Sequence, residues 1–207
     1  MIKYLFILTL LASSFAFGQS FTKVSNTASV KSKINAKAKS TTSISADFTE
    51  EVYSSMFNSA KKATGELNYK QSNKIRWEHI SPKKQTILIN GSKVQMKENG
   101  KIVDNVASNR IVKKVQGMMM QLFNGDFLNE KEFTIGYYES SSQYKLVLKP
   151  KSSRMSKYIS SIEMIFNKKN LELSQMNMIE TEDDRVEYKF TSVVMNKAIA
   201  DTKFTQF

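Results

Sequence analysis

Apolar and polar residues alternate with a period of two over much of the chain, which is the pattern of β-strands that bury one face. Three such runs occur between Gly65 and Gly91, and turn residues stand at Ser81-Pro82 and Asn90-Gly91. Asn-Gly favours a type I′ turn, since both central residues of that turn take positive φ. We therefore expect three consecutive antiparallel strands of a curved sheet. Their alternating pairs are Leu67 and Tyr69, Ile75 and Trp77, and Ile87 and Ile89.

Similar runs elsewhere bring the expected total to about 11 strands. With two or three helices, this pattern predicts an α+β fold built on one antiparallel sheet. No repeat, proline-rich linker or change in composition divides the chain after its N-terminal segment, so we expect a single domain over residues 19–207. Besides residues 65–70, 74–80 and 85–90, the expected strands are residues 44–55, 93–97, 101–106 (paired across Asn99-Gly100), 133–138, 144–149, 159–166, 171–180 and 186–193.

Two segments change to a helical period. Residues 25–40 carry a modest apolar face of Ala28, Ile34 and Ala38. In residues 108–125, apolar residues recur at three- and four-residue spacing, with Ser108 as a cap and Gly125 as a stop. Methionine adapts to flexible apolar ligands, so this second helix either contacts such a ligand or only plugs the core. The candidate ligand contacts on it are Met118, Met119, Leu122 and Phe123.

The N-terminus has the features of a secretory signal. Lys3 precedes an apolar run from Tyr4 to Phe17, and Ala16-Phe17-Gly18 offers small residues for cleavage. The run is short for a membrane span, which needs about 20 apolar residues, so a cleaved signal over residues 1–18 is preferred to a retained anchor. The chain has no cysteine, which excludes disulfides and a lipid attached through cysteine.

The formal net charge of +12 favours anionic partners. The signal removes the chain from nucleic acid, so attraction to a membrane surface is the preferred use of this charge. Lys31, Lys33, Lys37 and Lys39 recur within the first predicted helix, where such a run commonly only solvates one face.

The sequence offers little for catalysis. His79 is the only histidine, and neither a cysteine nor a G-x-S-x-G motif accompanies it. The acidic residues between Glu180 and Asp184 lack the spacing of a calcium loop, and no nucleotide-binding glycine motif occurs. We expect no enzymatic activity, no metal site and no cofactor.

The order of G-x-L, R-W-E, P and I-x-N-G between Gly65 and Gly91 closely resembles the outer-membrane lipoprotein carrier protein (LolA) family. Residues 47–50 (D-F-T-E) are similar to an F-T-Q element of its first strand, and residues 146–151 to its L-x-P-K segment. The resemblance covers nearly all of the chain after the signal. It implies an incomplete antiparallel barrel with a helical lid or plug over an apolar cavity, in which Phe48, Leu67 and Trp77 are candidate ligand contacts.

The chain departs from the family at the lid. Family members fasten the lid with an arginine, followed by proline, six residues before the strand tryptophan, and here Gln71 and Ser72 take those positions. Gln71 can donate hydrogen bonds without charge assistance. Arg76 is a possible substitute, although it points to the opposite sheet face from Trp77. The candidate lid contacts are therefore Gln71 and Arg76.

Trp77 shares a face with Ile75, and we expect this face to turn inward toward the helix of residues 118–123. The opposite face carries Lys74, Arg76 and Glu78, and we expect it to meet water. The indole N–H needs a polar partner, which places the ring near the mouth of the cavity.

The resemblance implies a monomeric periplasmic chaperone that binds the acyl chains of lipid-modified proteins. It would receive them from an inner-membrane ABC-type releasing complex and pass them to an outer-membrane acceptor, without nucleic acid or a nucleotide of its own. Two alternatives stay open. One is a carrier for another amphiphile, such as a glycolipid or a polyketide-type lipid. The other is an envelope interaction domain with a filled core and no carrier activity.

Overall fold

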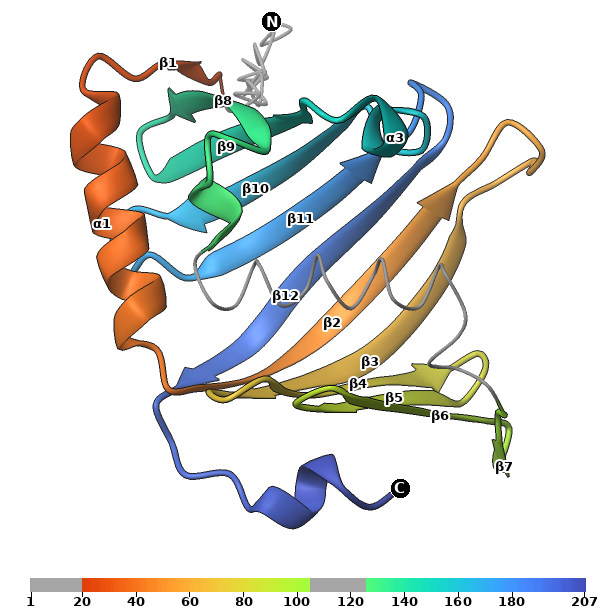
Figure 1. The fold of residues 1–207 in the computed structure, drawn as a ribbon. Coiled ribbons are helices and arrows are strands. Elements are labelled where there is room, and N and C mark those ends of the chain that lie inside the picture. Colours follow the sequence, from red (N-terminus) through yellow and green to blue (C-terminus); the bar gives the residue numbers. More distant parts are fainter. Residues whose placement is uncertain (1–19, 105–125) are drawn as a thin grey trace, which may run out of the picture.

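The computed structural model describes residues 20–104 and 126–207. They form one 12-stranded sheet in which every neighbouring pair is antiparallel, in the order β1-β8-β9-β10-β11-β12-β2-β3-β4-β5-β6-β7. β1 and β7 do not pair with each other, so the barrel is open (Figure 1). The strands are β1 (Thr22–Lys23), β2 (Ser43–Tyr53), β3 (Lys61–Lys70), β4 (Lys74–Ser81), β5 (Gln85–Asn90), β6 (Lys93–Glu98), β7 (Lys101–Ile102), β8 (Phe133–Glu139), β9 (Gln143–Pro150), β10 (Ser161–Asn167), β11 (Leu173–Ile179) and β12 (Arg185–Met195).

The incomplete antiparallel barrel expected from the sequence is confirmed. The alternation missed β1, which has only two residues and pairs with the end of β8. It also began β3 at Gly65, whereas the strand starts at Lys61. The strand expected at 101–106 is β7, which ends at Ile102, and the helix expected at 108–125 lies outside the described residues.

Two hairpin turns contain the Asn-Gly pairs noted in the sequence. Asn99 and Gly100 both have positive φ, at 47° and 83°, as a type I′ turn requires. The type I′ turn expected at Asn90-Gly91 is wrong: Asn90 pairs with Lys93, so the central residues are Gly91 and Ser92, and only Gly91 has positive φ. A turn with positive φ at its first central residue alone matches type II′ instead.

Helix α1 (Thr27–Ser40) confirms the first predicted helix and lies across the strand ends on one side of the sheet (Figure 1). The Asn26 side chain caps it by accepting a hydrogen bond of 3.0 Å from the Ser29 backbone N–H. Val30 and Ile34 are its buried residues, whereas the sequence pointed to Ala28, which is exposed. In residues 20–104 and 126–207, no helix combines the length and apolar character needed to cross a membrane.

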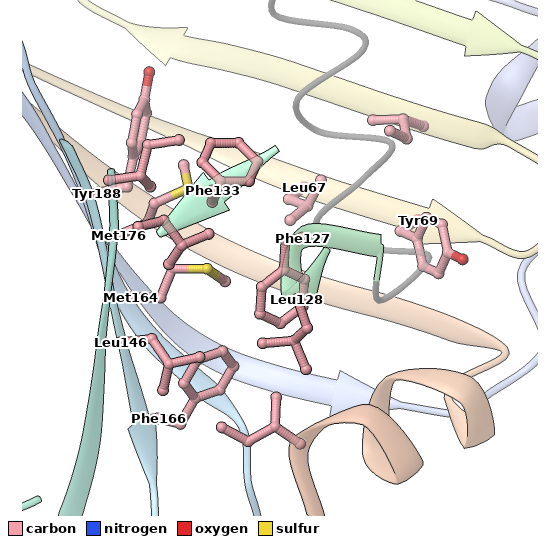
Figure 2. Packing of buried hydrophobic residues seen from close by; sticks show 14 of the residues in the cluster. Leu67, Tyr69, Phe127, Leu128, Phe133, Leu146, Met164, Phe166, Met176 and Tyr188 are labelled. Atoms are coloured by element: carbon pink, nitrogen blue, oxygen red, sulfur yellow. The ribbon is translucent and has the colours of Figure 1, made fainter. Parts of the chain in front are cut away.

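The core lies on the inner face of the sheet, against α1 and the short 3₁₀-helix η2 (Asp126–Leu128). Figure 2 shows Phe127 and Leu128 of η2 between side chains of β3 and side chains of β10. The ring of Phe127 stacks at 6.2 Å from that of Phe166. η2 therefore fills part of the space that the open barrel encloses.

The outer face of β4 is covered by the C-terminal segment. In the 3₁₀-helix η3 (Asp201–Phe204), Asp201 pairs with Lys70 and Lys74, at 2.7 and 3.0 Å. Arg76 Nη1 donates to the backbone carbonyls of Lys203 and Gln206. The expectation that this charged face meets water is therefore wrong for β4, where the Arg76 side chain is only 11% exposed. Sequence alternation could not show which segment returns to cover the face.

Candidate ligand-binding site

An apolar pocket of about 70 Å³ lies between α1 and the inner face of the sheet. Strands β2, β4, β10, β11 and β12 and the helices α1 and η2 contribute to its wall. Its polar side chains are Lys37 and Thr41, both from α1 or its C-terminal cap. The apolar side chains around it are Ile34, Ala38, Ile44, Trp77, Phe127, Met164, Phe166, Leu171, Leu173, Met176, Phe190 and Met195.

A second hollow, of about 340 Å³, lies at the other end of the strands. Val52, Met178 and Val186 line it. They stand two residues along their strands from Glu50, Met176 and Tyr188, which are paired across β2, β12 and β11. Residues two apart on a strand share a face of the sheet. The two hollows therefore lie on the same sheet face, separated by the aromatic residues at its centre.

The structure places the predicted contacts at different depths. Trp77 lines the pocket, and Leu67 lines an adjoining hollow of about 30 Å³. Phe48 is 1% exposed and lies in the core directly behind Trp77. The predicted contacts Met118, Met119, Leu122 and Phe123 lie outside the described residues.

Aromatic rings surround Trp77 on the inner face. The Phe48 ring stacks on it with a centroid distance of 4.5 Å, and the Tyr188 ring meets it edge-on at 5.3 Å. Phe190 approaches from the pocket side at 6.4 Å. Trp77 is only 3% exposed, so it belongs to the core and to the pocket wall at once.

Phe48 can reach Trp77 because the residue between them is Gly65. Gly65 pairs with Phe48 on β2 and with His79 on β4. A Cβ atom at Gly65 would collide with the Phe48 ring and with the backbone oxygen of Glu78. Side chains of β2 therefore cross over β3 at this point and touch those of β4.

Glu50, His79 and Tyr188 form a polar cluster beside these rings. The Glu50 Oε2 atom lies 2.9 Å from His79 Nε2, and the Tyr188 hydroxyl also donates to the Glu50 carboxylate. His79 Nδ1 is buried and has no hydrogen-bond partner within residues 20–104 and 126–207. Burial acts to raise the pKa of Glu50, but the bonds from His79 and Tyr188 outweigh it and leave the pKa below its ordinary value of 4.5.

Glu50→Gln is expected to lower the free energy of unfolding by about 1–3 kcal/mol at neutral pH, since it removes the charged acceptor of two hydrogen bonds. A carboxylate whose pKa is depressed in the folded state stabilises the fold above its ordinary pKa, and this contribution is lost as the pH falls through the lower folded value. The difference between wild type and variant should therefore shrink below pH 4.5. Urea unfolding across this range measures it.

Glu66→Gln is the matched control for this measurement. It removes the same charge from the outer face of β3, where the residue pairs with Glu78 in the sheet. Its effect on the free energy of unfolding should be small. Equal effects of the two variants on stability would show that the Glu50 cluster contributes nothing specific.

The two candidate lid contacts lie in different places. Gln71 Nε2 donates a 3.2 Å hydrogen bond to the carbonyl of Thr41, the C-cap residue of α1. Gln71 therefore joins the β3–β4 turn to the end of the helix that covers the pocket. Arg76 faces the other way, as its position beside Trp77 predicted, and its side chain holds the C-terminal segment and Glu78.

Sequence reasoning missed most of the pocket wall. Met164 lies on β10, Met176 on β11 and Phe190 on β12. The period of two in each strand marks them as inward-facing, but it does not say which inward-facing residues border a hollow. Phe127 follows the predicted second helix and has no periodic neighbours. Only the fold brings these side chains to α1.

Comparison with known proteins gives the family. The model of the outer membrane lipoprotein carrier protein LolA family matches residues 39–206, which includes every strand from β2 to β12. The chain belongs to the LolA family. Among curated proteins, none matches the sequence.

Solved structures share the fold at low sequence identity. The MucA/MucB complex of Pseudomonas aeruginosa contains a chain that is 14% identical, with a TM-score of 0.51, over 86% of this chain and 60% of that chain. A LolA superfamily protein from Nitrosomonas europaea is 11% identical, with a TM-score of 0.45, over 85% of this chain and 97% of that one. An outer membrane lipoprotein-sorting protein domain from Vibrio parahaemolyticus is 6% identical, with a TM-score of 0.43, over 85% and 94%. At these identities the likeness concerns the fold alone.

Proposed function

We propose that this LolA-family protein is a periplasmic carrier that binds the acyl chains of lipoproteins and moves them from the inner to the outer membrane. The supporting observation is the apolar pocket between α1 and the inner face of an open sheet. Acyl chains are recognised by the apolar area they bury, at about 0.8 kcal/mol per methylene, and this wall offers such area. A carrier needs no catalytic group.

The same proposal includes the path of the protein and its partners. Residues 1–18 would be a signal peptide that is cleaved, leaving residues 19–207 as one periplasmic domain that works as a monomer. The donor would be an inner-membrane ABC-type releasing complex, and the acceptor would lie at the outer membrane. The likeness to lipoprotein carriers supports both partners.

The pocket must enlarge to hold a whole acyl chain. Its volume of about 70 Å³ is well below the roughly 300–1,000 Å³ of common ligand sites. Three methionines of the described residues line it, and their unbranched side chains can rearrange around a flexible ligand. Lys31 near the start of the helix above it pairs with Glu130, but the C-terminal end is held by the uncharged hydrogen bond from Gln71, which costs less to break than a charge-assisted bond. We infer that α1 moves away from the sheet when a chain enters.

The direct test is binding of a fluorescently labelled diacylated lipopeptide to the purified protein, followed by fluorescence anisotropy. Ala38→Phe is expected to weaken this binding about tenfold or more, because the new ring occupies the pocket that Ala38 lines. Ala36→Phe is the matched control, since Ala36 is exposed on the same helix. It should bind as the wild type does.

Three outcomes separate the candidate functions. Binding of the lipopeptide that Ala38→Phe weakens and Ala36→Phe leaves unchanged supports the lipoprotein carrier. Absence of lipopeptide binding, with a glycolipid or another lipid co-purifying in native mass spectrometry, favours a carrier for a different amphiphile. Absence of any bound amphiphile favours the envelope interaction domain. In cells, lipoproteins that still reach the outer membrane after depletion of the protein would contradict the proposal.

A further inference from the structure

Lys37 occupies an unusual position on α1. Its helical neighbours at three- and four-residue spacing are the buried Ile34 and Thr41 on one side and the exposed Lys33 and Ser40 on the other, so Lys37 stands at the edge of the buried face. Ile34 and Ala38 on the same face line the pocket, and Lys37 lines it with them. Positions on the sheet-facing side of an amphipathic helix are normally apolar, so a half-buried lysine beside them is unusual.

The surroundings of Lys37 do not neutralise it. Its neighbour Lys31, two turns earlier on α1, pairs with Glu130 at 2.6 Å. For Lys37 Nζ, the side chains of residues 20–104 and 127–207 provide no ion pair and no hydrogen bond, and none of their carboxylates lines the pocket. Residues 1–19 and 105–125 contain neither aspartate nor glutamate. The described wall of the pocket thus offers no anion to Lys37.

The chemistry of the pocket follows from this arrangement. Among the described residues, every lining side chain other than Lys37 and Thr41 is apolar, and the Thr41 hydroxyl already donates to the Lys37 carbonyl at 2.8 Å. A ligand that fills the pocket brings an apolar chain into contact with the wall and its terminal group toward Lys37, the cation among the described lining residues. A negative terminal group gains a charge-assisted hydrogen bond there, whereas a neutral group does not.

We propose that the pocket selects amphiphiles with an anionic group, a carboxylate or a phosphate, which binds Lys37 Nζ while the chain lies against Trp77 and the methionines. This rests on the proposed function, in that an acyl chain must enter the pocket. It goes further by naming the charge of the ligand group nearest α1. The acyl chains of a lipoprotein are joined through uncharged ester and amide bonds, so an anionic preference favours the carrier for a different amphiphile over the lipoprotein carrier. Lys37 is in this view the residue that sets ligand preference.

The test compares three probes of one chain length: dodecanoate, dodecan-1-ol and dodecylamine, each below the concentration at which it forms micelles. The full-length purified protein is titrated while the emission of Trp77, the only tryptophan, reports on the pocket wall. The wild type is expected to bind dodecanoate at least about fivefold more tightly than dodecan-1-ol, and dodecylamine more weakly than either. Acetate, which has the anionic group without the chain, should give no response at the same concentrations.

Two variants assign the preference to one side chain. Lys37→Gln should lose the preference for dodecanoate and keep its affinity for dodecan-1-ol, and Lys37→Met should do the same while keeping the apolar contacts of the stem. Lys33→Gln removes the same charge from an exposed position one turn away and should behave as the wild type.

The outcomes distinguish this inference from the function on which it rests. Equal binding of dodecanoate and dodecan-1-ol by the wild type would overturn the anionic preference and leave an acyl carrier. Equal loss in Lys33→Gln and Lys37→Gln would also overturn it, since the effect would then come from overall charge. A response to acetate alone would overturn the linked site of chain and anion. Failure of all three chains to bind would overturn the acyl carrier as well.

Discussion

Replacement of Trp77 by alanine is expected to lower the free energy of unfolding by about 3–5 kcal/mol, the range for loss of a large aromatic core side chain. The ring is 3% exposed and contacts Phe48 and Tyr188, with centroid distances of 4.5 and 5.3 Å. Its removal would join the space it leaves to the pocket under α1. Denaturant unfolding, followed by far-UV circular dichroism because the variant has no tryptophan, measures the change.

Trp77→Phe is the matched control for this loss. It keeps an aromatic ring against Phe48 and should cost clearly less than the alanine variant. A loss below about 1 kcal/mol in Trp77→Ala would contradict a core position, because a ring that only borders a ligand space leaves few packed contacts behind. The wild-type emission tests the place of the ring in the pocket wall separately, since a ring there should respond to a bound acyl chain.

Gly65→Ala is expected to destabilise the fold by about 3 kcal/mol or more, at the upper end for added volume in a packed core. The new Cβ would meet the backbone oxygen of Glu78 and the Cζ atom of Phe48, and Phe48 Cε1 would be 2.7 Å away. The backbone oxygen belongs to the paired strand β4 and cannot withdraw without breaking the ladder. Thermal unfolding should show the loss as a large decrease in Tm.

Gly136→Ala provides the comparison at another strand glycine. There the new Cβ would meet the Tyr138 ring, whose Cε2 atom is 2.9 Å away, and a side chain can rotate aside. Its cost should be much smaller than that of Gly65→Ala. Similar losses of stability at both positions would mean that the close approach of Phe48 to Gly65 does not make this glycine harder to replace than Gly136.

The alternation of apolar residues predicted nearly every strand because each strand buries one face, and period two records that burial directly. The same alternation carries no information on which strands pair over long distances. Trp77 could be assigned to the inner face from Ile75 alone, but its contact with Tyr188 depends on β12 reaching the middle of the sheet. The pocket wall shares this limit, since Phe190 and Met176 come from strands late in the chain.

The polar cluster shows a second limit of sequence reasoning. Glu50 and His79 are 29 positions apart, on strands that are not neighbours in the sheet. Their contact depends on the missing side chain at Gly65, and a glycine in a strand pattern signals a close approach without naming the partner. Arg76 is a similar case, because its carbonyl partners belong to a segment with no strand pattern of its own.

The position of β12 between β11 and β2 determines when the fold can be completed. β12 is the last strand in chain order, yet it pairs along most of its length with β2, near the start of the domain, for example at Ser45 and Val194. Until β12 is present, the strands before it form two separate meanders, β2 to β7 and β8 to β11. Closing the loop between β2 and β12 carries an entropic cost that short hairpins avoid, and contacts of such high sequence separation slow folding. The central strands of the sheet are thus the last to be joined, and the inner face has no complete wall until the whole domain is present.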